Sequence, residues 1–153
     1  MKLNKKGFTL VELLAVIVIL AVVMLVAVTA VGPAITNSKK GTFFSSASAM
    51  VDAAALWSAT NAPTSTVCKK ASTLASTGFL QKKDSKFFGA VLITVGTNNT
   101  YTYTIFAANN DYSAGSATAP VDISTIRTSD NVYTLGTTKL TEDPTKLGST
   151  NCD

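Results

Sequence analysis

The amino-acid sequence predicts an α+β protein in which one long N-terminal hydrophobic helix packs against a small antiparallel sheet. Residues 8–31 form an apolar run, and an apolar stripe with helical spacing follows it. Beyond residue 86 come two β-rich stretches separated by a turn. The chain has 153 residues, enough for one compact domain with one appended element.

The apolar run is long enough to cross a membrane. Its 24 residues contain only three polar side chains, those of Thr9, Glu12 and Thr29. As a helix it would extend ~36 Å, against a hydrocarbon core of roughly 30 Å. A secretory signal peptide cut near residues 28–30, a plain membrane anchor and a buried core helix are all open, and composition favours the first two.

Gly32 and Pro33 interrupt this run. Proline lacks an amide donor and clashes with the preceding turn, so we expect a kink or local melting of the helix between Thr29 and Pro33. A simple bend at the membrane exit is equally open. Lys39 and Lys40 follow; they could contact anionic lipid, but a solvated helix face is the preferred interpretation.

A second helical half is predicted by apolar residues at three- and four-residue steps. The stripe consists of Phe43, Ala47, Met50, Ala54 and Trp57. The helix should continue to about Ala59 and end at residues 61–63, because Pro63 disfavours helix in the residue before it. We expect the stripe to back a sheet.

The remaining elements follow from β-propensity and turn residues. Residues 87–95 and 100–107 are predicted strands of a hairpin, joined by a turn at 96–99. The other expectations are a connecting region at 64–86 with a short helix over 69–76 ended by Gly78, a polar loop at 109–119, a third candidate strand at 131–135, and no assignment for 137–153.

Composition excludes several classes of function. The chain contains no histidine, the commonest general base and metal ligand. Its formal charge of +4 depends on Lys2, Lys5 and Lys6, because without these three the 13 basic residues become 10 against 9 acidic ones. A nearly neutral body gives no reason to expect nucleic-acid binding.

Glu12 is the one acidic residue of the apolar run, and its presence there needs a physical explanation. An ionised carboxylate in hydrocarbon costs ~2.5 to 3.5 kcal/mol. A favourable position in the helix dipole contributes only ~0.3 to 1 kcal/mol. The carboxylate therefore needs a cationic partner.

The residues from Lys5 to Glu12 read KKGFTLVE and precede the apolar run. They closely resemble the N-terminus of type IV pilins and pseudopilins, with its class III prepilin signal. The shared features are a basic leader that ends in glycine, a phenylalanine after it, a glutamate four residues further on and a continuous apolar helix. The resemblance implies that a prepilin peptidase cleaves between Gly7 and Phe8 and methylates the new amine of Phe8.

The resemblance also implies a partner for Glu12. In a staggered filament its carboxylate would meet the Phe8 ammonium of a neighbouring copy inside an apolar core. Removing either charge would leave the other buried and unpaired, a cost of ~3 to 5 kcal/mol. Implied partners are copies of the chain itself, the peptidase, the assembly platform and motor proteins of the pilus, and the membrane before assembly.

The resemblance divides the chain into a leader at 1–7, a hydrophobic helix at 8–33, and a unit at 34–153. That last unit would hold the C-terminal half of the helix and an α+β head, in the lollipop layout of pilins. The precursor would lie in the bacterial cytoplasmic membrane and the mature subunit in a filament at the cell surface.

Cys68 and Cys152 are the only cysteines. In an exported head an even pair should form a disulfide, whereas a cytosolic chain would keep two inert thiols. Export of the head would favour a disulfide between these two cysteines. It would close a loop of about 85 residues and remove roughly 4.5 kcal/mol of unfolded-state entropy.

Motifs for catalysis, cofactor binding or metal binding are not found in the sequence. We therefore expect no enzymatic activity, no cofactor and no metal. Asn98 opens an N-glycosylation acceptor pattern, which a hairpin turn explains equally well. The candidate oxygen ligands for calcium lack regular spacing and are expected to be solvated loop acids. They are Asp111, Asp122, Asp130, Glu142 and Asp143.

The function that these features favour is that of a structural pilus subunit, in a surface filament for adhesion or motility. A pseudopilin or minor pilin of a type II secretion or DNA-uptake system is the alternative within the family. A membrane-tethered binding protein or enzyme that never polymerises is the alternative of another class.

Overall fold

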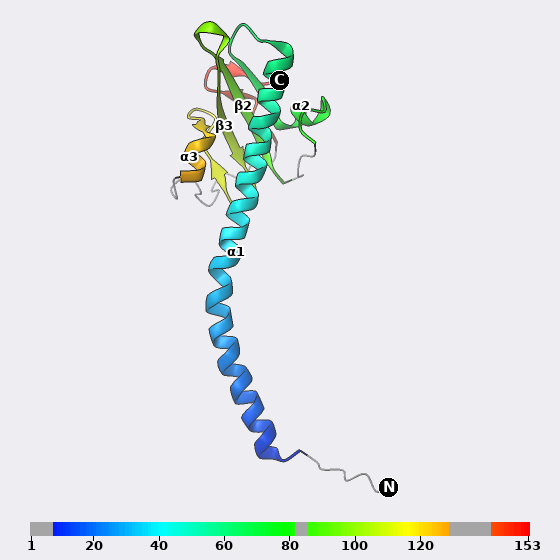
Figure 1. The fold of residues 1–153 in the computed structure, drawn as a ribbon, viewed down its shortest axis with the longest axis vertical. Coiled ribbons are helices and arrows are strands. Elements are labelled where there is room, and N and C mark those ends of the chain that lie inside the picture. The colour runs from blue at the N-terminus through cyan, green and yellow to red at the C-terminus, as the bar shows by residue number, and fades with distance from the viewer. Residues whose placement is uncertain (1–7, 82–85, 129–141) are drawn as a thin grey trace. The chain divides into compact units, whose positions relative to one another are not determined.

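The computed structural model describes residues 8–81, 86–128 and 142–153. Its chain divides into two units, residues 1–38 and residues 39–153, which are described separately. One helix, α1 at Leu10–Asn61, contributes to both. The apolar helix followed by an antiparallel sheet gives the α+β architecture that the sequence predicts (Figure 1).

In the N-terminal unit the described residues, 8–38, are exposed, and from Leu10 on they are helical. All residues from Phe8 to Ser38 are solvent-exposed, although most of their side chains are apolar. By length and composition this part of α1 is able to cross a membrane. An apolar surface of this extent requires lipid or protein to cover it.

The helix is unbroken at Gly32 and Pro33. Local melting, one of the two expected effects, is therefore absent here, while a kink at these residues stays a prediction. Proline removes a single backbone donor, and the neighbouring turns keep theirs. Thr29 Oγ1 also donates to the Val26 carbonyl at 2.8 Å, and Thr36 Oγ1 donates to the Gly32 carbonyl at 3.1 Å.

The second half of α1 packs against the sheet, as predicted. Phe43, Ala47, Met50 and Ala54 are fully buried, and Trp57 is partly buried against the same core. The helix ends at Asn61, the first of the residues expected to end it. Ala62 follows with a φ of 44° and donates its N–H to the Ser58 carbonyl at 2.8 Å.

The sheet is antiparallel, in the strand order β1-β2-β3-β4, with β5 also pairing with β3. Its centre is the predicted hairpin, each strand of which starts one residue later than expected. In the hairpin turn Asn98 and Asn99 adopt left-handed φ values of 59° and 56°. The strands are β1 Val67–Lys70, β2 Phe88–Val95, β3 Tyr101–Ala108, β4 Ser113–Ala114 and β5 Val121–Asp122.

Of the short elements, one helix and the turn of the hairpin were predicted, and the others were not. The expected short helix begins only at Ala71, because β1 occupies the residues before it. The 131–135 candidate strand lies outside the described residues. The short elements are α2 Ala71–Ser76, η1 Thr97–Asn99, α3 Ile123–Thr128, β6 Lys146–Leu147 and β7 Thr150–Asn151.

The sheet buries side chains on both faces. Val91 and Ile93 of β2 face the main core with α1, whereas Ala90 faces a second cluster. This alternation follows from the two-residue period of a strand. The second cluster contains Cys68, Ala90, Phe106, Leu147 and Cys152. The C-terminal segment therefore covers the sheet face opposite α1.

Candidate functional site

The first turn of α1 holds the Glu12 carboxylate in place. Glu12 Oε2 accepts hydrogen bonds from the backbone N–H of Thr9 at 2.8 Å and from Thr9 Oγ1 at 2.9 Å. In return, the Glu12 N–H donates to Thr9 Oγ1 at 3.3 Å. These reciprocal bonds form a capping box, the arrangement in which a threonine and a glutamate three residues later satisfy unpaired helix donors.

The capping box was missed in the sequence, although its T-x-x-E signature is present there. The capping box gives Glu12 a structural role at the helix start, because its carboxylate accepts the Thr9 N–H in addition to interacting with the helix dipole. Both hydrogen bonds go to Oε2, so Oε1 keeps its lone pairs for another donor. The partners on Thr9 are neutral, and the carboxylate therefore still lacks a counter-ion among the described residues.

The structure describes one of the two residues at the expected cleavage junction. Phe8 is 83% exposed, and Gly7 lies outside the described residues. Phe8 precedes Thr9 directly, so an ammonium on Phe8 would be formed next to the capping box. A neighbour that approached this end of α1 would meet a carboxylate and an amine within one helical turn.

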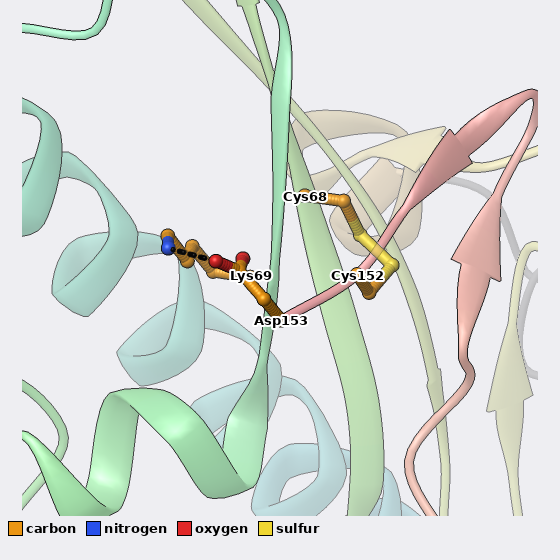
Figure 2. The surroundings of a disulfide bond; sticks show 4 residues. All are labelled: Cys68, Lys69, Cys152 and Asp153. Carbon is orange, nitrogen blue, oxygen red and sulfur yellow. Dashed lines mark hydrogen bonds and ion pairs between the residues drawn. A yellow bond between two sulfur atoms is a disulfide. The ribbon is translucent and has the colours of Figure 1, made fainter.

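A disulfide joins β1 to the C-terminal segment, as predicted. Cys68 and Cys152 are bonded across 84 positions of sequence, with their Cα atoms 4.4 Å apart (Figure 2). Both residues are buried. Asp153 extends the connection, because its N–H donates to the Cys68 carbonyl at 3.2 Å and its carbonyl accepts from the Lys70 N–H at 2.9 Å. The outer edge of β1 thereby gains a short parallel neighbour.

Lys69 strengthens this junction from the other side of β1. Figure 2 shows its side chain directed away from the disulfide, toward the Asp153 carboxylate. Lys69 Nζ lies 2.9 Å from Asp153 Oδ2 and 4.3 Å from the centroid of the Trp57 ring. The lysine side chain is only 11% exposed. An ion pair and a cation–π contact therefore join the C-terminal segment, β1 and α1.

The expectation of solvated loop acids is wrong for Asp143. Its two carboxylate oxygens accept backbone hydrogen bonds from Ser72 at 2.8 Å and Gly89 at 2.9 Å. Asp111 is also paired, since its Oδ1 lies 3.2 Å from Lys39 Nζ.

The other three acids differ in their surroundings. Asp122 accepts hydrogen bonds from the Ser124 hydroxyl and the Ser124 backbone N–H, which together lower the pKa of its carboxyl. Glu142 is exposed, and Asp130 lies outside the described residues. Within the described ranges, groups of three or more potential metal ligands are not found.

The head also has an open cavity of about 500 Å³ beside Phe106. Polar groups around it come from serines, threonines and Lys146. Among its described lining residues, Lys146 carries the one charged side chain. The hairpin turn accounts for Asn98 through its left-handed backbone.

Comparison with known proteins gives one match. A family model for the prokaryotic N-terminal methylation motif matches residues 2–28. No curated protein and no solved structure matches the chain.

The matched motif is the class III prepilin signal of type IV pilins and pseudopilins. It indicates a pilin-like substrate of prepilin peptidase, and together with the apolar helix a membrane-anchored precursor. The match ends within α1, ahead of the head.

Proposed function

We propose that this chain is a structural subunit of a type IV pilus. In this proposal prepilin peptidase cleaves between Gly7 and Phe8 and methylates the Phe8 amine. The mature chain is then withdrawn from the membrane and polymerises through the helix at residues 8–33. The head, residues 34–153 with the second half of α1, forms the outer surface of the filament.

The observation that carries the proposal is an exposed apolar helix whose first part lies within the matched methylation motif. Residues 8–38 are exposed throughout, and the side chains of Leu10 and Leu25 are 84% and 72% exposed. Such a surface is stable in a membrane, or against equally apolar helices of other copies. A subunit that moves from the first environment to the second needs no change in this helix.

The charges expected on Glu12 and on the amine of Phe8 suit packing against the helices of other copies. The Glu12 carboxylate is costly in hydrocarbon unless a cation reaches it. Cleavage would supply that cation on Phe8 of every copy, and a staggered assembly would bring the two together. The capping box on Thr9 would hold the carboxylate ready and leave Oε1 for the neighbour.

The head suits a structural role. Its β1 edge is joined covalently to the C-terminal segment, which makes the head a cross-linked unit. Enzymatic activity is not part of the proposal. The remaining partners in the proposal are the assembly platform and motor proteins, which act on the membrane-held subunit.

The experiment is mass spectrometry of the mature N-terminus, combined with analysis of sheared surface fibres. We expect an N-methylated Phe8 as first residue and the chain as the abundant component of the fibres. A correctly processed chain that is scarce in the fibres would indicate a pseudopilin or minor pilin. A mature terminus at or after Ala30 would establish secretory cleavage and contradict the proposal, as would a chain that retains residues 1–7.

A further inference from the structure

A hollow of about 350 Å³ lies between the second half of α1 and the residues that follow α2. Its polar lining residues are Asp52 and Gln81, and the rest of its lining is apolar. We propose that this hollow, here called the lysine socket, binds the side chain of Lys146 of a second copy of the chain. The apolar wall of the socket consists of Ala49, Ala53, Leu56, Phe79 and Leu80.

The lining of the socket has the chemistry that a lysine side chain requires. Lysine carries an ammonium with three donors at the end of an apolar four-carbon stem, and the stem packs well on apolar surface. Leu56 follows Asp52 by four positions, so the two side chains are neighbours on one face of α1. Leu56 is 57% exposed, the one large hydrophobic residue so exposed among the described residues of 39–153. The stem would cover this surface while the ammonium reaches the carboxylate.

The Asp52 carboxylate is available for such a partner. Among the described residues it takes part in neither an ion pair nor a hydrogen bond, and it is exposed. The other aspartates described in the head are all engaged with lysines, hydroxyls or backbone donors. They are Asp111, Asp122, Asp143 and Asp153.

Lys146 is the lysine that fits the socket. It is exposed in β6, next to Leu147, whose side chain is buried, and within the described part of the chain it has no ion pair or hydrogen bond. The other described lysines are either engaged or less exposed. Lys39 and Lys69 form ion pairs, Lys40 and Lys86 have interactions within the chain, and Lys70 is half-buried.

Lys146 and the socket lie on opposite sides of the same head. Lys146 lines the cavity beside Phe106, and Phe106 belongs to the cluster on the sheet face away from α1. Asp52 is on the outer side of α1, which covers the other face. Figure 2 shows the C-terminal strands and the helices on different sides of β1. The lysine that enters the socket must therefore come from another copy.

A contact between two different surfaces is heterologous. Each added copy leaves a free socket on one side and a free Lys146 on the other, so copies can be added in one direction. An exposed ion pair contributes little by itself. The inference therefore rests on the proposed function for the setting that brings heads together, and the contact would fix which surfaces of neighbouring heads meet.

The test uses the full chain at high density in phosphatidylcholine vesicles, which requires no filament. A carbodiimide activates carboxylates, and an amine in contact then forms an amide with release of a urea. Half of the chains carry a heavy nitrogen isotope. We expect mass spectrometry to find Asp52 of light chains joined to Lys146 of heavy chains, and a gel run with reductant to show a ladder of dimers and larger species.

Two variants and their mixture test the direction of the contact. Asp52→Asn alone and Lys146→Gln alone should each lose the ladder, because each chain then lacks one half of the contact. In a mixture of the two variants, one chain still offers Lys146 and the other still offers Asp52. We expect this mixture to form dimers but no larger species.

Leu56→Ala tests the apolar wall while keeping both reacting groups. Loss of contact with the lysine stem should lower the yield of the Asp52–Lys146 link by about three- to tenfold. Glu142→Gln and Lys70→Gln remove a charge outside the socket and should leave the yield unchanged. Circular dichroism and electrophoresis without reductant would establish that each variant keeps its helix and disulfide.

The outcomes distinguish this contact from the proposed pilus. Absence of the link, a link from Asp52 to a different lysine, or larger species in the mixture of variants would overturn the contact. An unchanged yield in Leu56→Ala would overturn the packing of the lysine stem. Linked copies in vesicles from a strain without surface fibres would support the contact and contradict the pilus. Fibres rich in the chain but without the link would do the reverse.

Discussion

The Asp143 carboxylate accepts a hydrogen bond of 2.8 Å from the backbone N–H of Ser72, which lies 71 positions earlier in the chain. Ser72 is in the first turn of α2, and the residue before that helix, Lys70, makes no side-chain cap hydrogen bond. Asp143 therefore caps a helix from a distant part of the sequence. Through its second oxygen, which accepts from Gly89, it also connects the C-terminal segment to β2.

Replacing Asp143 with alanine should destabilise the head. The change leaves two backbone N–H groups without their acceptor, and we expect the free energy of unfolding to fall by ~1 to 3 kcal/mol. Urea denaturation of the full chain in detergent, followed by the fluorescence of Trp57, measures the change. Glu142→Ala is the control, because Glu142 is an exposed acid next in sequence, and it should have little effect.

Loss of the disulfide should have a larger effect. We expect Cys152→Ser to lower the free energy of unfolding by ~2 to 5 kcal/mol, because the unfolded chain regains the freedom of a long loop. The double variant with Cys68→Ser and the reduced wild type should behave alike in the same assay. Quantitative labelling of both thiols in the native surface protein would contradict the pairing.

Glu12→Val separates insertion from assembly. Removing a charge from hydrocarbon should leave membrane insertion intact or improve it. Assembly should fail, because the Phe8 ammonium of each added subunit would enter the filament core without its counter-ion. The measurement compares sheared fibres with correctly cleaved, membrane-held subunit. Normal amounts of fibre would show that the carboxylate is not needed.

Thr9→Val is the matched variant for this experiment. It removes the hydroxyl of the capping box but keeps the Glu12 carboxylate. We expect a loss of ~0.5 to 2 kcal/mol in the stability of the helix start, together with continued fibre formation. Equal loss of fibres in Thr9→Val and Glu12→Val would assign the defect to helix capping.

Gly7→Val tests the cleavage junction. In the proposed function prepilin peptidase approaches the backbone closely at this residue, and a side chain would obstruct it. The precursor should accumulate uncleaved in the membrane, with its mass retaining residues 1–7. Normal processing of this variant would show that the glycine is not required.

The elements that were predicted from the sequence are those with strong local patterns. The stripe from Phe43 to Trp57 has a helical period, and the hairpin strands have β-propensity on both sides of a clear turn. The capping box of Thr9 and Glu12 was equally local and could have been read from its signature. The candidate strand at 131–135 stays a prediction.

The features that were missed depend on distant partners. β1 is four residues long and pairs with β2 on one side and with Asp153 on the other. Asp143 lies in a polar stretch, and nothing near it in sequence identifies Ser72 or Gly89 as its donors. Strands of two residues, such as β4, form where other strands provide the pairing, so periodicity cannot detect them.

The pairing of Cys68 with a residue 84 positions later also affects the time course of biosynthesis. A ribosome delivers α1 first, so the apolar helix can enter the membrane while the acceptor of Ser72 and the partner of Cys68 are still unmade. During that interval one thiol of each nascent head is free to react. With two cysteines in the chain, early oxidation between crowded copies would join Cys68 to Cys68. If the head is exported as proposed, translocation of Cys152, rather than formation of the helix, sets the moment at which the head can no longer be cross-linked through Cys68.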